Sequence, residues 1–230
     1  MIKNWILLYL WQLLALFPVP ARTARENEAV NRQCLQRLEQ VCAEGFLEDQ
    51  DSLRGLRFGN GYDFAYNGCS VIAVYNALHA LREPVNAEVL LRTVQALQKK
   101  GAAWQGKYGV SPLALKRYWK RSGYQVRTCL GADPAQLNRL GEASETVLAV
   151  VWNGGRLRDQ FHAVNIEKPN GGYIIHNTYY FIRESNGAQT YMEKGPFGSL
   201  SEAIAQTTDK GARPALVLGI CHATEKRRQA

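Results

Sequence analysis

The feature that most constrains the fold of this chain is a change in apolar spacing near its midpoint. Before residue 123, apolar side chains recur at helical spacing, as in residues 70–81. After it come short segments rich in β-branched and aromatic residues, at 124–130, 146–152, 161–168, 173–182 and 215–221. Helices grouped ahead of strands predict an α+β fold, with a helical half packed on an antiparallel sheet.

The second half contains one strand pair whose register can be predicted. A glycine-rich turn follows residue 168, and its Asn-Gly pair accepts the positive φ that a hairpin needs. Placing Lys168 opposite Tyr173 makes His162 and Asn177 diagonal neighbours on one face, about 7–8 Å apart at Cα. His176 then lies on the opposite face, and a slip of one residue would exchange the two. The pattern therefore favours Asn177 as the partner of His162.

Cys69 stands at the expected start of the apolar helix, directly after Gly68. The positive end of the helix dipole stabilises a thiolate, and the Cys69 amide is available to donate to an oxyanion. Together with His162 and Asn177 it forms a nucleophile, base and orienter set. The competing interpretation is structural, with a small buried Cys69, a hydrogen-bonded His162 and a turn-capping Asn177.

Three motifs carry a family resemblance, and they are Tyr66-Asn67-Gly68-Cys69-Ser70-Val71-Ile72-Ala73, Ser111-Pro112 before a basic helix, and Phe161-His162-Ala163-Val164 leading to His176-Asn177-Thr178. Over about residues 58–222 the chain resembles the papain-like cysteine peptidases, above all the bacterial group that cleaves double-glycine leader peptides and its stand-alone relatives. The resemblance implies a papain-like α+β fold in which Cys69 on the central helix faces His162 and Asn177 on the sheet. It also implies hydrolysis of amide bonds in a peptide or small protein, with no metal or organic cofactor.

Two positions depart from the pattern of that family. Ser70 follows the nucleophile where the family usually has glycine, and Asp63 stands where a glutamine usually donates to the oxyanion. An ionised carboxylate has no hydrogen to donate, so Asn67 is predicted as the substitute donor. Two alternatives to a peptidase stay open: an acyltransferase or transglutaminase-like enzyme on the same fold, and a catalytically silent binding module.

The N-terminus carries an apolar run from residue 5 to residue 17 that only Gln12 interrupts. A helix of this length extends about 20 Å, short of the roughly 30 Å of a bilayer core. Residues 1–21 are therefore predicted to form a signal peptide or a membrane-surface anchor, in which Trp5, Tyr9 and Trp11 would lie at the interface. The third alternative is an ordinary helix of the protein core. We expect the chain to be secreted or membrane-associated. Residues 22–57 predict an amphipathic helical segment, and residues 223–230 a polar tail.

The basic excess is concentrated in one stretch. The net charge is +8, and nine Lys or Arg but no Asp or Glu lie between Val89 and Ala132. Such a stretch is either a solvated helix face or a surface for an anionic membrane or an acidic peptide. No nucleic-acid-binding motif accompanies it, so no nucleic acid partner is expected. The five cysteines are too few for a disulfide scaffold, and their odd number leaves at least one thiol unpaired.

Overall fold

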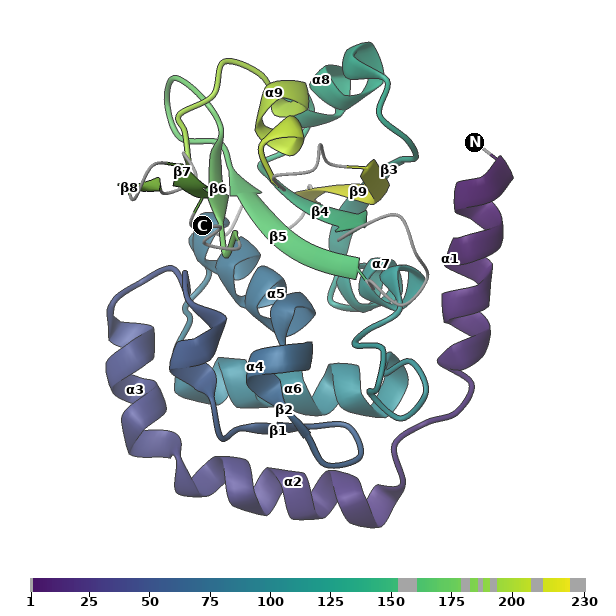
Figure 1. Cartoon of the computed structure of the whole chain (residues 1–230), viewed down its shortest axis with the longest axis vertical. Helices are drawn as coiled ribbons and strands as arrows, with labels where there is room; N and C mark the ends of the chain where they lie inside the picture. Colours follow the sequence, from purple (N-terminus) through teal and green to yellow (C-terminus); the bar gives the residue numbers. More distant parts are fainter. Residues whose placement is uncertain are drawn as a thin grey trace.

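The computed structural model describes residues 2–152, 161–178, 183–185, 188–190, 194–207 and 213–223. Its helices are α1 (Ile2–Leu14), α2 (Ala21–Gln33), α3 (Leu35–Ala43), the short 3-10 helix η1 (Gln50–Leu53), α4 (Phe64–Asn67), α5 (Cys69–Ala80), α6 (Ala87–Lys100), α7 (Pro112–Arg121), α8 (Pro134–Glu142) and α9 (Leu200–Ala205). Its strands are β1 (Arg57–Phe58), β2 (Tyr62–Asp63), β3 (Tyr124–Cys129), β4 (Thr146–Trp152), β5 (Phe161–Glu167), β6 (Ile174–His176), β7 (Arg183–Ser185), β8 (Ala188–Thr190) and β9 (Arg213–His222). The α+β prediction is confirmed, because most helices come first and gather in one half of the molecule (Figure 1).

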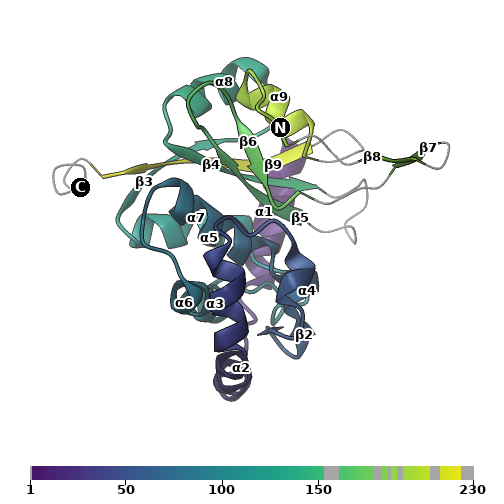
Figure 2. The same cartoon turned by 90° about the vertical axis from the view of Figure 1, so that its left-hand side faces the viewer.

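An antiparallel sheet of five strands, in the order β3-β9-β4-β5-β6, separates two apolar cores. Figure 2 shows α5 to α7 on one face of this sheet and α8 and α9 on the other. Alternate strand residues enter the two cores: Leu148 and Ala163 join the α5 side, while Val147 and Val164 join the α8 and α9 side. Every residue of β4 is buried as a result.

The predicted hairpin register is confirmed by the pairs Asn165–His176 and Ile166–Ile175. The second strand is nevertheless much shorter than the expected span of residues 173–182. Asn177 adopts a φ of +61°, a left-handed conformation that cannot continue a strand, so β6 ends at His176. Residues 179–182 of the expected strand lie outside the described residues.

Residues 22–57 differ from the single amphipathic helix that apolar spacing predicts. Two helices, α2 and α3, meet at Cys34. The inward face of α2 is partly polar: Asn27 Nδ2 donates to Gly59 O (2.6 Å), and Asn31 exchanges hydrogen bonds with the backbone of Arg57 (2.7 and 3.0 Å). These amides anchor α2 to the β1 backbone by hydrogen bonds, a contact that hydrophobic periodicity cannot reveal.

The N-terminal helix α1 lies against the body of the protein beside α7 (Figure 1). Trp11 is only 2% exposed and makes edge contacts with the rings of Trp152 and Phe161. The prediction that Trp11 lies at a membrane interface is therefore wrong, whereas Trp5 and Tyr9 are exposed. Among the helices that the structure describes, none has both the length and the apolar character to cross a bilayer.

The last turn of α1 is fastened to the loop of residues 101–110. Trp104 N donates to Leu14 O (2.8 Å), and Gln105 N donates to Phe17 O (3.0 Å). These bonds hold the end of α1, and the residue three positions beyond it, against the loop. The same loop passes so close to β1 that a Cβ at Gly59 would lie 2.4 Å from Gln105 O, and only glycine fits there.

We predict that Trp11→Ala lowers the free energy of unfolding by about 3–5 kcal/mol, because it removes a large buried ring that packs against the rings of Trp152 and Phe161. Urea denaturation of the full chain measures this. Trp5→Ala is the matched control, since Trp5 is 42% exposed on the outer face of the same helix. Equal effects of the two substitutions would show that α1 does not pack as described.

Candidate active site

Cys69 occupies the first position of α5, at the seam between the helical half and the sheet. Gly68 makes this placement possible, because a Cβ there would lie 2.3 Å from the Phe64 ring. Asn67 Nδ2 donates to Gly106 O (2.8 Å), which ties the helix start to the loop of residues 101–110. The thiol is thus held at a helix N-terminus whose backbone is fixed from two sides.

The thiol lies against the backbone of β5 on either side of His162. Cys69 Sγ is 4.0 Å from Phe161 O and 4.0 Å from Ser70 Oγ. Burial raises the pKa of the Cys69 thiol, while the Ala163 amide, the Ser70 hydroxyl and the amides at the helix start act in the opposite direction. Those amides are the donors that a helix N-terminus offers to a negative charge.

His162 is buried on β5, and its ring is oriented by a backbone group. Its Nε2 lies 2.7 Å from Asn177 O. Because a carbonyl oxygen only accepts, the hydrogen of the neutral ring must be on Nε2, and Nδ1 is then the basic nitrogen. Burial lowers the pKa of His162 from its ordinary value to about 4, against a smaller opposing effect of the Asn177 bond. The imidazole is therefore neutral at pH 7.

Asn177 contacts His162 through its carbonyl group and not through the side-chain amide that the register predicts. The positive φ of Asn177 is the reason, since it takes this residue out of the alternation of a strand. Its side-chain Nδ2 is buried and has no hydrogen-bond partner among the described residues. The two residues are brought together as expected, by a different atom.

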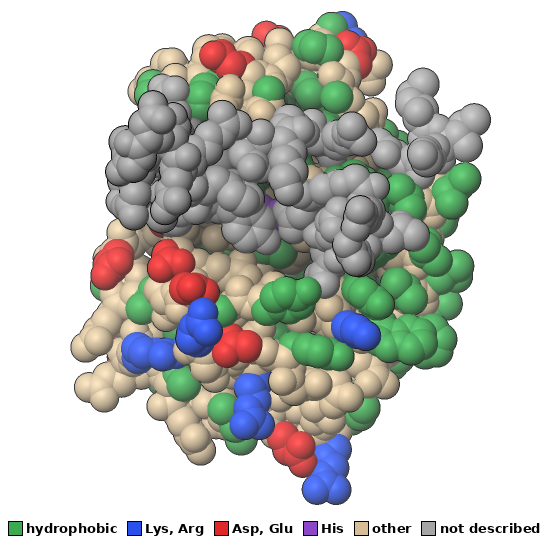
Figure 3. Space-filling model, viewed as in Figure 1, with side chains coloured by type: hydrophobic (Ala, Val, Ile, Leu, Met, Phe, Trp, Pro, Cys, Tyr) green, Lys and Arg blue, Asp and Glu red, His purple; other side chains and the backbone are tan. Residues whose placement is uncertain are grey.

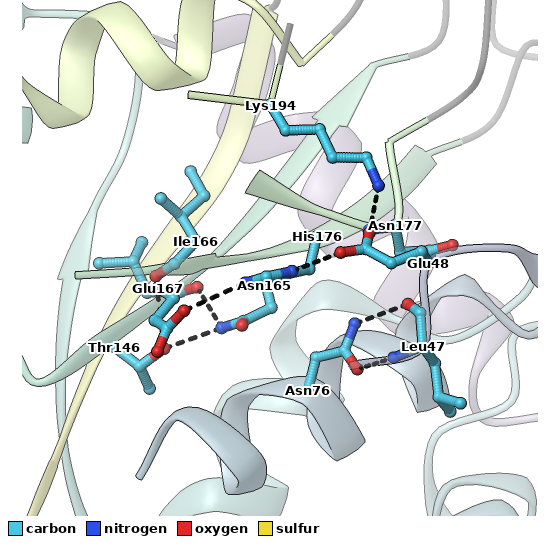
Figure 4. A network of polar contacts seen from close by, with 11 residues as sticks. Leu47, Glu48, Asn76, Thr146, Asn165, Ile166, Glu167, His176, Asn177 and Lys194 are labelled. Carbon is cyan, nitrogen blue, oxygen red and sulfur yellow. Dashed lines mark hydrogen bonds and ion pairs between the residues drawn. The ribbon is translucent and has the colours of Figure 1, made fainter. Parts of the chain in front are cut away.

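Glu48, in the linker between α3 and η1, is the residue of this site that sequence reasoning missed. Its Oε2 accepts a hydrogen bond from the Asn177 amide (3.0 Å), and its Oε1 lies 2.7 Å from His176 Nδ1 (Figure 4). Lys194 Nζ completes the group at 3.3 Å from Oε2. Burial alone would raise the pKa of Glu48, but the bonds from His176 and Asn177 and the nearby positive charges hold that pKa below its usual value.

Helix α5 also sets the position of Glu48. Asn76 Oδ1 accepts from Leu47 N (2.8 Å), and Asn76 Nδ2 donates to Leu47 O (2.9 Å), so the backbone next to Glu48 is held by a buried side chain of α5 (Figure 4). Phe46 stacks on the His176 ring with centroids 3.7 Å apart. A chain of polar contacts thus runs from α5 through Leu47 and Glu48 to Asn177. No sequence signal points to Glu48, which lies in a segment without a motif.

The two positions considered for oxyanion binding have structural contacts. Asp63 caps α4 by accepting from Ala65 N (2.8 Å). Asn67 uses one of its two amide hydrogens on Gly106 O, so its role as a donor to an oxyanion stays a prediction. In the part of the chain that is described, no group of three or more His, Cys, Asp or Glu side chains could hold a metal ion.

The comparisons with known proteins include one distant likeness to a solved structure. No protein-family model matches this chain, and no curated protein matches it in sequence. A similar solved structure is the peptidase domain of Streptococcus ComA, described as a bi-functional ABC transporter involved in a quorum sensing pathway. It is 14% identical, covers 69% of this chain and 93% of its own, and has a TM-score of 0.39. A likeness at this level says nothing of activity.

We predict that the buried His162 makes the protein less stable in mild acid. The imidazole takes up a proton near pH 6.5 in the unfolded chain but only near pH 4 in the folded one. The free energy of unfolding is therefore at its full value above pH 6.5, and it decreases as the pH falls from 6.5 toward 4. At pH 5 the loss from this residue is about 2 kcal/mol relative to pH 7.5.

Urea denaturation at the two pH values, for the wild type and for His162→Gln, measures this loss. The variant should lack about 2 kcal/mol of the pH dependence that the wild type shows. An NMR titration of the wild-type imidazoles provides a second test that needs no variant. A His162 ring that titrates at pH 6 or above would contradict the prediction.

Proposed function

We propose that this chain is a papain-like thiol hydrolase that cleaves amide bonds in a peptide or small protein. Cys69 is the nucleophile, His162 is the base, and Asn177 orients the base. One observation carries the proposal: a thiol at a helix N-terminus lies against the strand backbone that flanks a neutral histidine of fixed tautomer. A cysteine and a histidine placed in this way are the parts of a nucleophile and its general base.

The proposed reaction proceeds in two steps. Cys69 Sγ attacks the amide carbon while its proton passes to His162 Nδ1, and the oxygen of the tetrahedral intermediate accepts from the amides of Cys69 and Ser70. The amine leaves with the proton from His162, and a thioester remains on Cys69. A water molecule then attacks the thioester, gives its proton to His162, and releases the acid as the thiol regains that proton.

The charge state of the site favours general-base catalysis over a preformed ion pair. Burial raises the pKa of the Cys69 thiol and lowers the pKa of His162, so both groups are neutral at pH 7. A neutral imidazole with Nδ1 unprotonated can take the thiol proton as the sulfur attacks. Proton transfer and attack are then coupled, as they are in a serine hydrolase.

A second candidate function is a catalytically silent binding module on the same fold. The observation in its favour is burial, since Cys69 is 8% exposed and His162 is 1% exposed. A third candidate keeps the thioester but transfers the acyl group to an amine, as an acyltransferase or transglutaminase-like enzyme does. The chemistry of Cys69 separates the first two, and the identity of the acceptor separates hydrolysis from transfer.

We predict that Cys69 is alkylated by iodoacetamide at pH 7.5 at least ten times faster than Cys129 in the same molecules. Both thiols are buried, but of the two only Cys69 lies at a helix N-terminus and against the strand residues that flank His162. Peptide mass spectrometry after short exposure gives the two rates. His162→Gln should slow the labelling of Cys69 at least tenfold and leave Cys129 unchanged, because it removes the base.

Equal rates at Cys69 and Cys129, unaffected by His162→Gln, would rule out both enzyme functions and leave the silent module. For a reactive thiol, a peptide library incubated with and without added glycinamide identifies the acceptor. Products ending in a free carboxylate indicate hydrolysis, and products carrying glycinamide indicate transfer. Cys69→Ala should abolish either product.

We further predict that Glu48 acts as a positioning residue, through Asn177, on His162. Glu48→Gln leaves one acceptor oxygen for the two donors on His176 and Asn177 and turns an NH₂ group toward the other donor. We expect kcat to fall about tenfold with KM unchanged, because the substitution disturbs the base and not the binding of substrate. The free energy of unfolding should fall by about 1–3 kcal/mol.

Glu44→Gln is the matched control, since it makes the same chemical change on an exposed residue at the end of α3. It should alter neither kcat nor stability. A purely structural role for Glu48 would lower stability without changing kcat of the folded fraction. An unchanged kcat in Glu48→Gln would therefore contradict the positioning role while leaving the assignment of Cys69 and His162 untouched.

A further inference from the structure

Helix α1 presents an apolar face that the rest of the described chain does not cover. Opposite the buried Trp11, a stripe of large side chains is exposed along the edge of the molecule (Figure 3), and its members are Trp5, Ile6, Tyr9, Leu10, Leu13 and Leu16. Phe17 extends the stripe and packs against the exposed Trp104, with ring centroids 4.8 Å apart. An exposed apolar patch of this kind marks an interaction surface in a soluble domain.

The neighbouring helix α7 carries the densest part of the basic stretch. Arg117 links it to α1 by donating to Gln12 Oε1 (2.7 Å), and α7 also packs against α6. Between α6 and α7 lies a pocket of about 330 Å³ with an apolar floor that includes Leu97, Ala114 and part of Tyr118. Four cations border it: Lys99, Lys100, Arg117 and Arg121.

These four cations form no ion pair with any carboxylate in the described part of the chain. Within the described residues, no carboxylate therefore neutralises their charge. An apolar floor with a cationic rim matches a ligand that joins a phosphate to an apolar body. Free inorganic phosphate would leave the floor without a partner.

We propose that α1 and the α6–α7 pocket together dock this protein on a bilayer that contains anionic phospholipids. The apolar stripe of α1 lies in the interface, with Trp5 and Tyr9 at headgroup level, and the pocket receives a lipid phosphate. The helix lies in the plane of the membrane, since its thirteen residues are too short to span it. The proposal does not depend on the chemistry of Cys69.

Flotation of the full chain with vesicles tests this docking. We expect binding to vesicles of phosphatidylcholine with 30% phosphatidylglycerol, and at least tenfold weaker binding to pure phosphatidylcholine. Ile6→Gln with Leu13→Gln should abolish binding at both compositions, because these side chains are 61% and 57% exposed in the stripe. Neither substitution touches the buried Trp11, so the fold should be retained, and circular dichroism checks this.

Lys100→Glu with Arg121→Glu tests the pocket separately. This pair should weaken binding to the anionic vesicles at least tenfold while leaving residual binding to phosphatidylcholine unchanged. Arg25→Glu with Arg54→Glu is the control, since it reverses the same charge on two exposed residues outside α1, α6 and α7. The control should bind as the wild type does.

Three outcomes would overturn the proposal. The first is equal binding to both vesicle compositions, or none. The second is a control pair that weakens binding as much as the pocket pair, which would show a mere effect of net charge. The third is self-association without lipid that Ile6→Gln with Leu13→Gln removes, measured by analytical ultracentrifugation, because the stripe would then be covered by a second copy of the chain.

Discussion

Helix α5 is apolar on nearly every side, and a helix of that kind is stable only when other elements enclose it. Every residue from Cys69 to Ala77 is buried. The sheet covers one side through β4 and β5, and α4 and α6 cover others. This enclosure decides where the thiol can lie, because the first residue of a central helix must be at the junction of the layers around it. The candidate site is therefore a consequence of the packing.

The proposed nucleophile and the proposed base are both held by this one helix. Cys69 begins α5, and two turns later Asn76 holds the backbone of Leu47, next to Glu48. Glu48 in turn holds the Asn177 amide, and the Asn177 carbonyl holds His162. A shift of α5 relative to the sheet would move both Cys69 and the contacts that orient His162, so their separation depends on few independent contacts. Preorganisation of this kind lowers the cost of reaching a reactive geometry.

Features coded by local chemistry could be predicted from the sequence. The hairpin register follows from the turn, and the start of α5 follows from Gly68 and the apolar run after it. Features that depend on tertiary partners could not. The left-handed Asn177 requires the carboxylate of Glu48, which is far away in the chain, and the buried Asn27 in α2 requires the Gly59 carbonyl. The apolar run at the N-terminus could not reveal which of its faces is covered.

The docking of Trp11 has a consequence for the order in which the molecule is made. Helix α1 is synthesised before the strands it packs against, and two of the rings that Trp11 contacts, Trp152 and Phe161, are added about 140–150 residues later. At about 5–20 residues per second, this interval lasts roughly 7–30 s. Until then Trp11 lacks two of its ring contacts, although the loop of residues 101–110 and α7, which also contact α1, are synthesised earlier. Docking of Trp11 can therefore be completed only after β4 and the start of β5 have been synthesised.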